Sequence, residues 1–142
     1  MRVTMMLADS AQAVDGKLYI LGGGWSIATS GAMSALALKL EVPWDLANQQ
    51  HQWRIDLLTE DGEPVMAGDG TPLHVEGQFE VGRPAGIPEG TPIDLPLAIN
   101  IGPLPLPAGR YVWQLIIDGQ TEEDWSRAFL VRDAPTPPPT AV

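Results

Sequence analysis

The chain has 142 residues, 44% of them hydrophobic, and 8 Lys and Arg against 18 Asp and Glu give it a net charge of −10. The hydrophobic fraction excludes a disordered chain, and the acidic balance makes nucleic acid and anionic membranes unexpected partners, because like charges repel. The chain has no cysteine, which excludes disulfides and thiolate metal sites.

The N-terminal segment does not match a signal peptide, because its apolar stretch is short and Asp9 interrupts it. No segment approaches the roughly 18 consecutive apolar residues that a membrane span needs. The sequence therefore predicts a soluble protein, with the cytoplasm as its expected location.

Short strands with alternating apolar residues, separated by turn residues, follow one another along the chain. The period of two is typical of antiparallel strands with one buried face. The 15 glycines and 14 prolines favour tight turns over helices. About eight strands are predicted, at residues 2–8, 17–21, 34–42, 52–59, 73–81, 92–101, 110–117 and 125–131.

The connections between these strands contain recognisable turn signals. Asp15-Gly16 is a hairpin signal, and Asp45 is expected to cap one short helical turn ending near Gln50. Gly77, on the apolar face of its strand, marks a bulge or the close approach of a neighbouring segment. Pro96 cannot donate a ladder hydrogen bond, so strand 92–101 is expected at a sheet edge or broken there.

The strand at 110–117 follows a Pro-Ala-Gly turn and places Tyr111 at its start. Tyr111 fits a tyrosine corner, in which the hydroxyl bonds backbone of the preceding turn; a core tyrosine with its hydroxyl at the rim is the alternative. The whole pattern predicts a single antiparallel β-sandwich of Greek-key or jelly-roll type over residues 1–133. Residues 134–142 are predicted to be a flexible, proline-rich tail.

Three motifs occur in a characteristic order: Leu7-Ala-Asp9, Gly16-Lys-Leu-Tyr-Ile-Leu-Gly-Gly23, and Pro107-Ala-Gly-Arg-Tyr111 with Ile117-Asp-Gly119. In this order they resemble an uncharacterised family of short bacterial β-sandwich proteins. The resemblance covers nearly the whole chain. It implies the sandwich fold and no activity, cofactor or catalytic residue.

No residue pattern predicts catalysis, a metal or a cofactor. Gly22-Gly23-Gly24 fits neither phosphate-binding glycine motif. The only histidines are His51 and His74, both expected to be solvated, and no nucleophile motif surrounds a serine. Acidic residues gather only at turns without calcium-loop spacing, although calcium held between loops stays an alternative. A non-enzymatic protein is predicted.

Five tryptophans are many for this length. Trp53 and Trp113 occupy inward positions of their strands. Trp25, Trp44 and Trp125 are the candidates for a binding surface, because an exposed indole can stack on a sugar ring or anchor a protein partner. Folding back over the core is the alternative for each of them.

Several outward positions are apolar, notably Val112 and Ile116, and also Ala35 and Ala37, and Met6 and Ala8 in the first strand. Either loops or a second subunit must cover such faces. The sequence therefore predicts a protein-interaction or assembly module, self-associating through an apolar sheet face or the edge strand at 92–101. A carbohydrate-type ligand module that uses the loop tryptophans is the alternative.

Overall fold

Two β-sheets face each other in the computed structural model, which describes residues 1–135. Most of the predicted tail, residues 136–142, lies outside the described residues. The strands are β1 (Arg2–Ala8), β2 (Ser10–Val14), β3 (Lys17–Leu21), β4 (Ile27–Thr29), β5 (Met33–Val42), β6 (His51–Thr59), β7 (His74–Phe79), β8 (Ile93–Pro103), β9 (Gly109–Ile117) and β10 (Ser126–Arg132).

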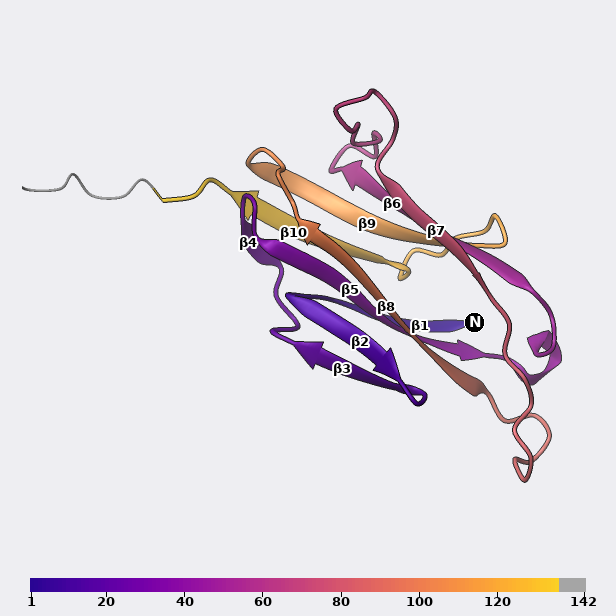
Figure 1. The fold of residues 1–142 in the computed structure, drawn as a ribbon. Coiled ribbons are helices and arrows are strands. Elements are labelled where there is room, and N and C mark those ends of the chain that lie inside the picture. The colour runs from indigo at the N-terminus through magenta and orange to yellow at the C-terminus, as the bar shows by residue number, and fades with distance from the viewer. Residues whose placement is uncertain (136–142) are drawn as a thin grey trace, which may run out of the picture.

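The elements form three layers, which Figure 1 shows from the side. A five-stranded sheet in the order β4-β10-β9-β6-β7 lies against a three-stranded sheet in the order β1-β5-β8. The hairpin β2–β3 lies on the opposite side of the three-stranded sheet and contacts β5 and β8. All strand pairs are antiparallel except β4 with β10. The predicted antiparallel β-sandwich is confirmed.

The core lies between the two sheets and is built from the alternating positions that the sequence pattern indicated. Leu36, Leu38 and Leu40 of β5 are fully buried, as are Ile55 of β6 and Leu115 of β9. Successive side chains of a strand point to opposite faces, so one apolar residue in two is enough to fill this space. Trp113 lies in the same cluster, as predicted, and Trp53 packs at its margin.

The sequence pattern missed two strands, β2 and β4. The sequence of β2, Ser-Ala-Gln-Ala-Val, lacks the large apolar residues that mark a strand, and β4 has only three residues. The turn that joins β2 to β3 was predicted correctly. Asp15 and Gly16 both have positive φ angles, 50° and 73°, which is the backbone geometry of a two-residue hairpin turn.

The hairpin covers the small apolar residues on the outer face of the three-stranded sheet. Ala11 of β2 packs with Ala35 and Ala37 of β5, and Met6 and Ala98 lie at the margin of this cluster. Alanine side chains leave room for the close approach of a third layer. On this face, therefore, the chain covers its own apolar surface.

Of the two arrangements expected for Tyr111, the structure shows the tyrosine corner. Its hydroxyl donates a 2.7 Å hydrogen bond to the carbonyl oxygen of Pro107, four residues earlier. Its ring stacks on Phe129 of β10, with centroids 5.7 Å apart. The corner fixes the start of β9 where the chain enters the five-stranded sheet.

Two positions singled out in the sequence have clear structural reasons. Pro96 lies in β8, which is an edge strand of the three-stranded sheet. Gly77 of β7 faces Trp53 of β6, and a Cβ atom there would come within 2.7 Å of the indole. The expected close approach is thus the ring of a cross-strand tryptophan.

The predicted cap at Asp45 is wrong. A short 3-10 turn spans Trp44–Leu46, Pro43 holds the capping position, and no side chain caps the turn. Asp45 lies inside the turn because the preceding proline already begins it. In the part of the chain that the structure describes, no helix has the length and apolar character needed to cross a bilayer.

Candidate functional site

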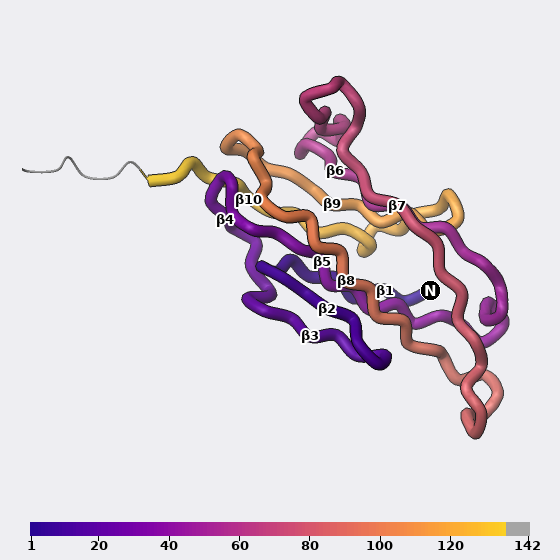
Figure 2. Tube along the Cα trace, in the orientation of Figure 1, coloured from indigo at the N-terminus to yellow at the C-terminus, as the bar shows by residue number. Residues whose placement is uncertain are grey.

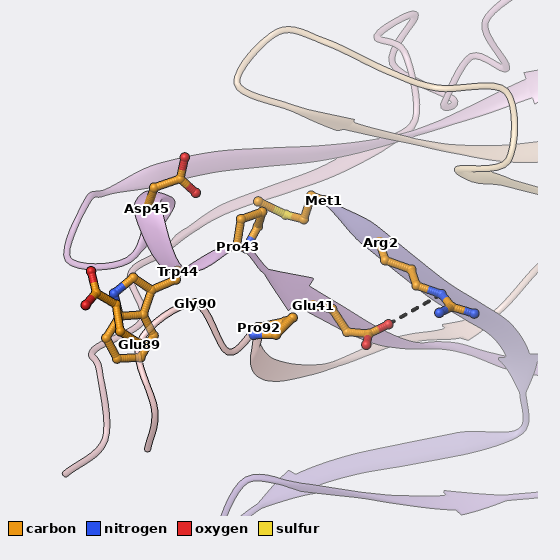
Figure 3. A pocket seen from close by; sticks show the side chains of 9 residues that line it. All are labelled: Met1, Arg2, Glu41, Pro43, Trp44, Asp45, Glu89, Gly90 and Pro92. Atoms are coloured by element: carbon orange, nitrogen blue, oxygen red, sulfur yellow. Dashed lines mark ion pairs between the residues drawn. The ribbon is translucent and has the colours of Figure 1, made fainter. Parts of the chain in front are cut away.

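Trp44 lies on the wall of an open cleft of about 580 Å³. Figure 3 shows Trp44 and Glu89 at one end of this cleft and the ion pair of Arg2 with Glu41, at 3.6 Å, at the other. The guanidinium carbon of Arg83 lies 4.8 Å from the centre of the indole, and its nitrogens donate to the carbonyl oxygen of Trp44. The tryptophan is held in place and half-exposed, as a binding platform requires.

Trp25 and Trp125 are placed differently. Trp125 is 6% exposed and belongs to the core, so it presents no ring to a ligand. Trp25 is half-buried, with its ring edge-on to Phe129, and its indole nitrogen donates to Asp9 at 3.2 Å. Trp25 also lines a smaller cleft of about 250 Å³ together with Ile27 and Met33.

Val112 and Ile116 lie on the outer face of the five-stranded sheet, both half-buried. They have different neighbours. Val112 pairs with Leu58 and Ala128 in an apolar row, whereas Ile116 pairs with Arg54 and lines a shallow polar depression with Gln52, Glu76 and Gln78. The outward apolar residues of β9 therefore belong to two surfaces of opposite character.

His51 is buried, not solvated as the sequence suggested. Its Nδ1 lies 2.7 Å from Oδ2 of Asp118, and its Nε2 lies 2.8 Å from the carbonyl oxygen of Leu46. Both neighbours are acceptors, so the protonated imidazole, which donates from both ring nitrogens, satisfies both of them. Burial lowers the pKa of His51, but the hydrogen bonds to Leu46 and Asp118 outweigh it and the net shift is upward.

The carboxylate of Asp118 completes this pair. It also accepts a 2.9 Å hydrogen bond from the backbone nitrogen of Gln52, and this bond, followed by that with His51, lowers the pKa of Asp118. The pair joins the 3-10 turn, the start of β6 and the end of β9. His74, in contrast, is exposed at the other end of the β6–β7 pair, as predicted.

The acidic turns do not converge. Within residues 1–135, no three His, Cys, Asp or Glu side chains lie close enough together to hold a metal ion. The clusters at 60–63 and 122–124 are exposed at separate turns.

Four exposed apolar side chains lie close together in the sequence of the hairpin β2–β3. Tyr19 is 57% exposed and Leu21 is 70% exposed, and Val14 and Ile20 are also exposed. Beside them runs a cleft of about 490 Å³, lined by both strands and by Asn100 of β8. The signal was present in the sequence: Leu18–Leu21 is apolar at every position, and a strand in an outer layer can bury only one face.

The order of Asp9 and the glycines in the sequence has a local structural cause. Asp9 follows β1 and donates its backbone N–H to Leu21 and Gly22 at the end of β3. A Cβ atom on Gly22 would collide with the Asp9 carboxylate, and Gly22 has a positive φ of 61°. Gly24 then donates to the carbonyl oxygen of Leu7 at 2.7 Å. These residues fasten the hairpin to β1.

The geometry therefore offers binding surfaces and one ion pair, between the buried His51 and the exposed Asp118. No curated protein matches the chain. One family model matches residues 3–129, which is most of the chain, and its description is that of a family of unknown function. This chain belongs to that family, DUF6941.

Proposed function

We propose that this chain is a non-enzymatic protein-interaction or assembly module, and that the hairpin β2–β3 is the part that binds. The observation that carries the proposal is the concentration of exposed apolar residues there. Within residues 1–135, eight large apolar side chains are exposed, and four of them lie on the hairpin: Val14, Tyr19, Ile20 and Leu21. Two more follow in the chain, Ile27 on β4 and Met33 on β5.

The charge distribution supports the same surface. Residues 10–33 contain only Asp15 and Lys17 as charged residues and are neutral overall, whereas the whole chain carries −10. Exposed apolar residues gathered in one region mark interaction sites more often than scattered ones do. An apolar surface with no net charge on a strongly acidic molecule is where a second protein can approach with little charge repulsion.

The environment of the histidines supports binding over catalysis. Both ring nitrogens of His51 are engaged, with Asp118 and with the carbonyl of Leu46, so neither is free to accept a proton from a nucleophile. His74 contacts Pro72 and Glu76, and no serine or threonine hydroxyl bonds to it among the described residues. Neither histidine has the arrangement that a hydrolase needs.

Site-specific photo-crosslinking in cells tests the proposal. The photoreactive residue p-benzoylphenylalanine is placed at Tyr19 on the hairpin surface, or at Gln114 on the outer face of the five-stranded sheet as the control. We expect a discrete adduct from position 19 and none from position 114. Absence of an adduct at position 19, or equal adducts at both positions, would overturn the proposal.

The cleft at Trp44 favours a second candidate function, the binding of a small carbohydrate. An indole platform beside the carboxylates of Glu41, Asp45 and Glu89 offers stacking for a sugar ring and acceptors for its hydroxyls. Titration with cellobiose and maltose should then change the tryptophan fluorescence saturably. The change should disappear in Trp44→Ala and persist in Trp25→Phe; a flat wild-type response would dismiss this candidate.

A further inference from the structure

We propose that β3 pairs edge to edge with β3 of a second copy of this chain, and that the two hairpins form one four-stranded antiparallel sheet in the order β2-β3-β3-β2. The inference rests on the proposed function and names the partner as a second copy. Four features of β3 support it: its edge is unprotected, its backbone groups point outward, its antiparallel register pairs apolar residues, and the surrounding stretch of chain has no net charge.

The edge of β3 is the least protected strand edge in the part of the chain that the structure describes. The hairpin contains only β2 and β3, so β3 has a strand partner on one side only. Its sequence, Lys-Leu-Tyr-Ile-Leu, contains no proline and one charge. Natural proteins usually guard such an edge with prolines, charges or a covering segment.

The other edges show those protections. The backbone of β1 is engaged by the guanidinium of Arg127, which donates to Met5 at 2.7 Å, and by Gly24, which donates to Leu7. In β8, Pro96 interrupts the row of donors. The edge strand β7 carries Glu76 near its centre, whereas the one charge of β3, Lys17, lies at its end. The strand β4 has only three residues, and on β2 the side chain of Asn100 bonds the backbone of Ala11.

The backbone groups of β3 point in the direction that pairing requires. Ala11 faces Ile20 across the hairpin, yet its N–H and C=O are bonded to the side-chain amide of Asn100, at 3.1 and 2.8 Å. Ala11 and Ile20 are therefore a non-hydrogen-bonded pair, and the N–H and C=O of Ile20 point away from β2. The same alternation turns those of Leu18 outward.

These groups suit an antiparallel copy centred on Tyr19. In that register Leu18 lies opposite Ile20 of the second copy and exchanges two hydrogen bonds with it, and the two-fold axis repeats this pair. Tyr19 then faces Tyr19 of the second copy as a close aromatic pair, and Lys17 faces Leu21. Apolar residues meet apolar residues, and no like charges are opposed.

The neutral charge of the hairpin region permits a second copy to approach. Two molecules of net charge −10 repel each other over most orientations. They can meet where the surface is neutral, and residues 10–33 are the neutral stretch that includes this edge. The pairing also continues the hairpin sheet without moving the layers beneath it.

Disulfide trapping tests the register directly, because the chain has no cysteine of its own. In Tyr19→Cys the two introduced residues would form a close pair with Cα atoms about 4.5 Å apart, which suits a disulfide. In the control Gln12→Cys, on the neighbouring strand and the same hairpin face, they would be about 14 Å apart. We expect rapid dimer formation for Tyr19→Cys alone; equal rates would overturn the register.

Light scattering over a concentration series tests the dimer without a crosslink. The wild type should double its mass from 15.2 kDa as concentration rises. Tyr19→Lys opposes two ammonium groups across the axis and should stay monomeric, whereas Gln12→Lys, with the same added charge, should dimerise. Circular dichroism confirms that both variants fold. A wild type that remains monomeric, or equal behaviour of the two variants, overturns the inference.

The outcomes separate this inference from the proposed function. If the wild type is monomeric but the photo-crosslinker at position 19 captures a protein of another mass, the hairpin binds a different partner and only the self-pairing is wrong. If position 19 captures nothing, the proposed function and the self-pairing are both wrong.

Discussion

The hydroxyl of Ser34 is buried without a hydrogen-bond partner among the described residues, in β5 beside an irregularity in its pairing with β8. An unsatisfied buried hydroxyl costs about 1–3 kcal/mol. We therefore expect Ser34→Ala to raise the free energy of unfolding, or leave it unchanged, when measured by urea denaturation.

Ser30 provides the matched comparison, because its hydroxyl donates a 2.7 Å hydrogen bond to the carbonyl oxygen of Leu106. Removing a satisfied hydrogen bond from a partly buried site lowers stability by about 1 kcal/mol. Ser30→Ala should thus destabilise the protein. Equal losses in the two variants would show that the Ser34 hydroxyl has a partner after all.

Between elements, the pair of His51 and Asp118 predicts a pH dependence of stability. The pKa of His51 is raised above 6.5 in the folded protein, so its contribution is complete below that pH and is lost as the pH rises through the folded pKa. The pKa of Asp118 is lowered below 3.8, so its contribution is complete above that pH and is lost as the pH falls through the folded value. Both contributions are complete between these two pH values.

Asp118→Asn tests this dependence while keeping the turn, because asparagine tolerates the positive φ of 51° at this position. The variant should lose about 1–2 kcal/mol relative to wild type at pH 5, and less at pH 8, by urea unfolding. Glu122→Gln, which removes an exposed carboxylate from the same connection, is the control. A loss that is the same at both pH values would contradict the ion pair.

The attachment of the hairpin gives another prediction at this scale. The side chain of Asn100 replaces a strand partner for Ala11, accepting from its N–H and donating to its C=O. Asn100→Ala should loosen the hairpin while the two sheets keep their packing, because the alanine contacts between the layers remain. Hydrogen exchange should become faster in residues 10–21 and stay unchanged in β6 and β9; unchanged exchange in the hairpin would show that the amide is dispensable.

The sequence predicted the strands that bury large apolar side chains on one face. Strands such as β5 and β9 place large apolar residues on one face at a period of two, so their positions and core faces could be found. The strand β2 could not be found in this way, because it packs against the three-stranded sheet through alanine and not through large apolar residues. The ion pair could not either, since His51 and Asp118 are 67 residues apart and meet only through the sheet register.

At the scale of the whole molecule, the third layer changes which apolar residues are exposed and can bind a partner. The outward alanines of β5 looked like an interface in the sequence, and the hairpin that covers them moves the exposed apolar surface to its own outer strand. Figure 2 traces this path, from β1 through the hairpin and back to β4 and β5. The residues predicted for association on β9 lie on the outer face of the five-stranded sheet, Val112 in an apolar row and Ile116 beside a polar depression.

This arrangement predicts the effect of Val112→Glu on assembly. Val112 lies in the apolar row of the outer sheet face, away from the β3 edge. If the hairpin is the interface, the variant should keep the concentration-dependent mass of the wild type in light scattering. Loss of the dimer in Val112→Glu, with Tyr19→Lys unaffected, would place the interface on the five-stranded sheet.

The net charge predicts how salt acts on the same association. Two copies of charge −10 must come together, while the pairing edge itself contributes only Lys17 and Asp15, so repulsion between the molecules opposes the dimer and no ion pair across the edge supports it. Raising sodium chloride from about 0.02 M to about 0.5 M shortens the screening length from roughly 20 Å to about 4 Å and should therefore strengthen the dimer. Sedimentation equilibrium at the two salt concentrations measures this change. Lys17→Glu, which adds negative charge beside the edge, should steepen the salt dependence; a dimer that weakens as salt rises would instead be held by ion pairs and would contradict pairing through a neutral edge.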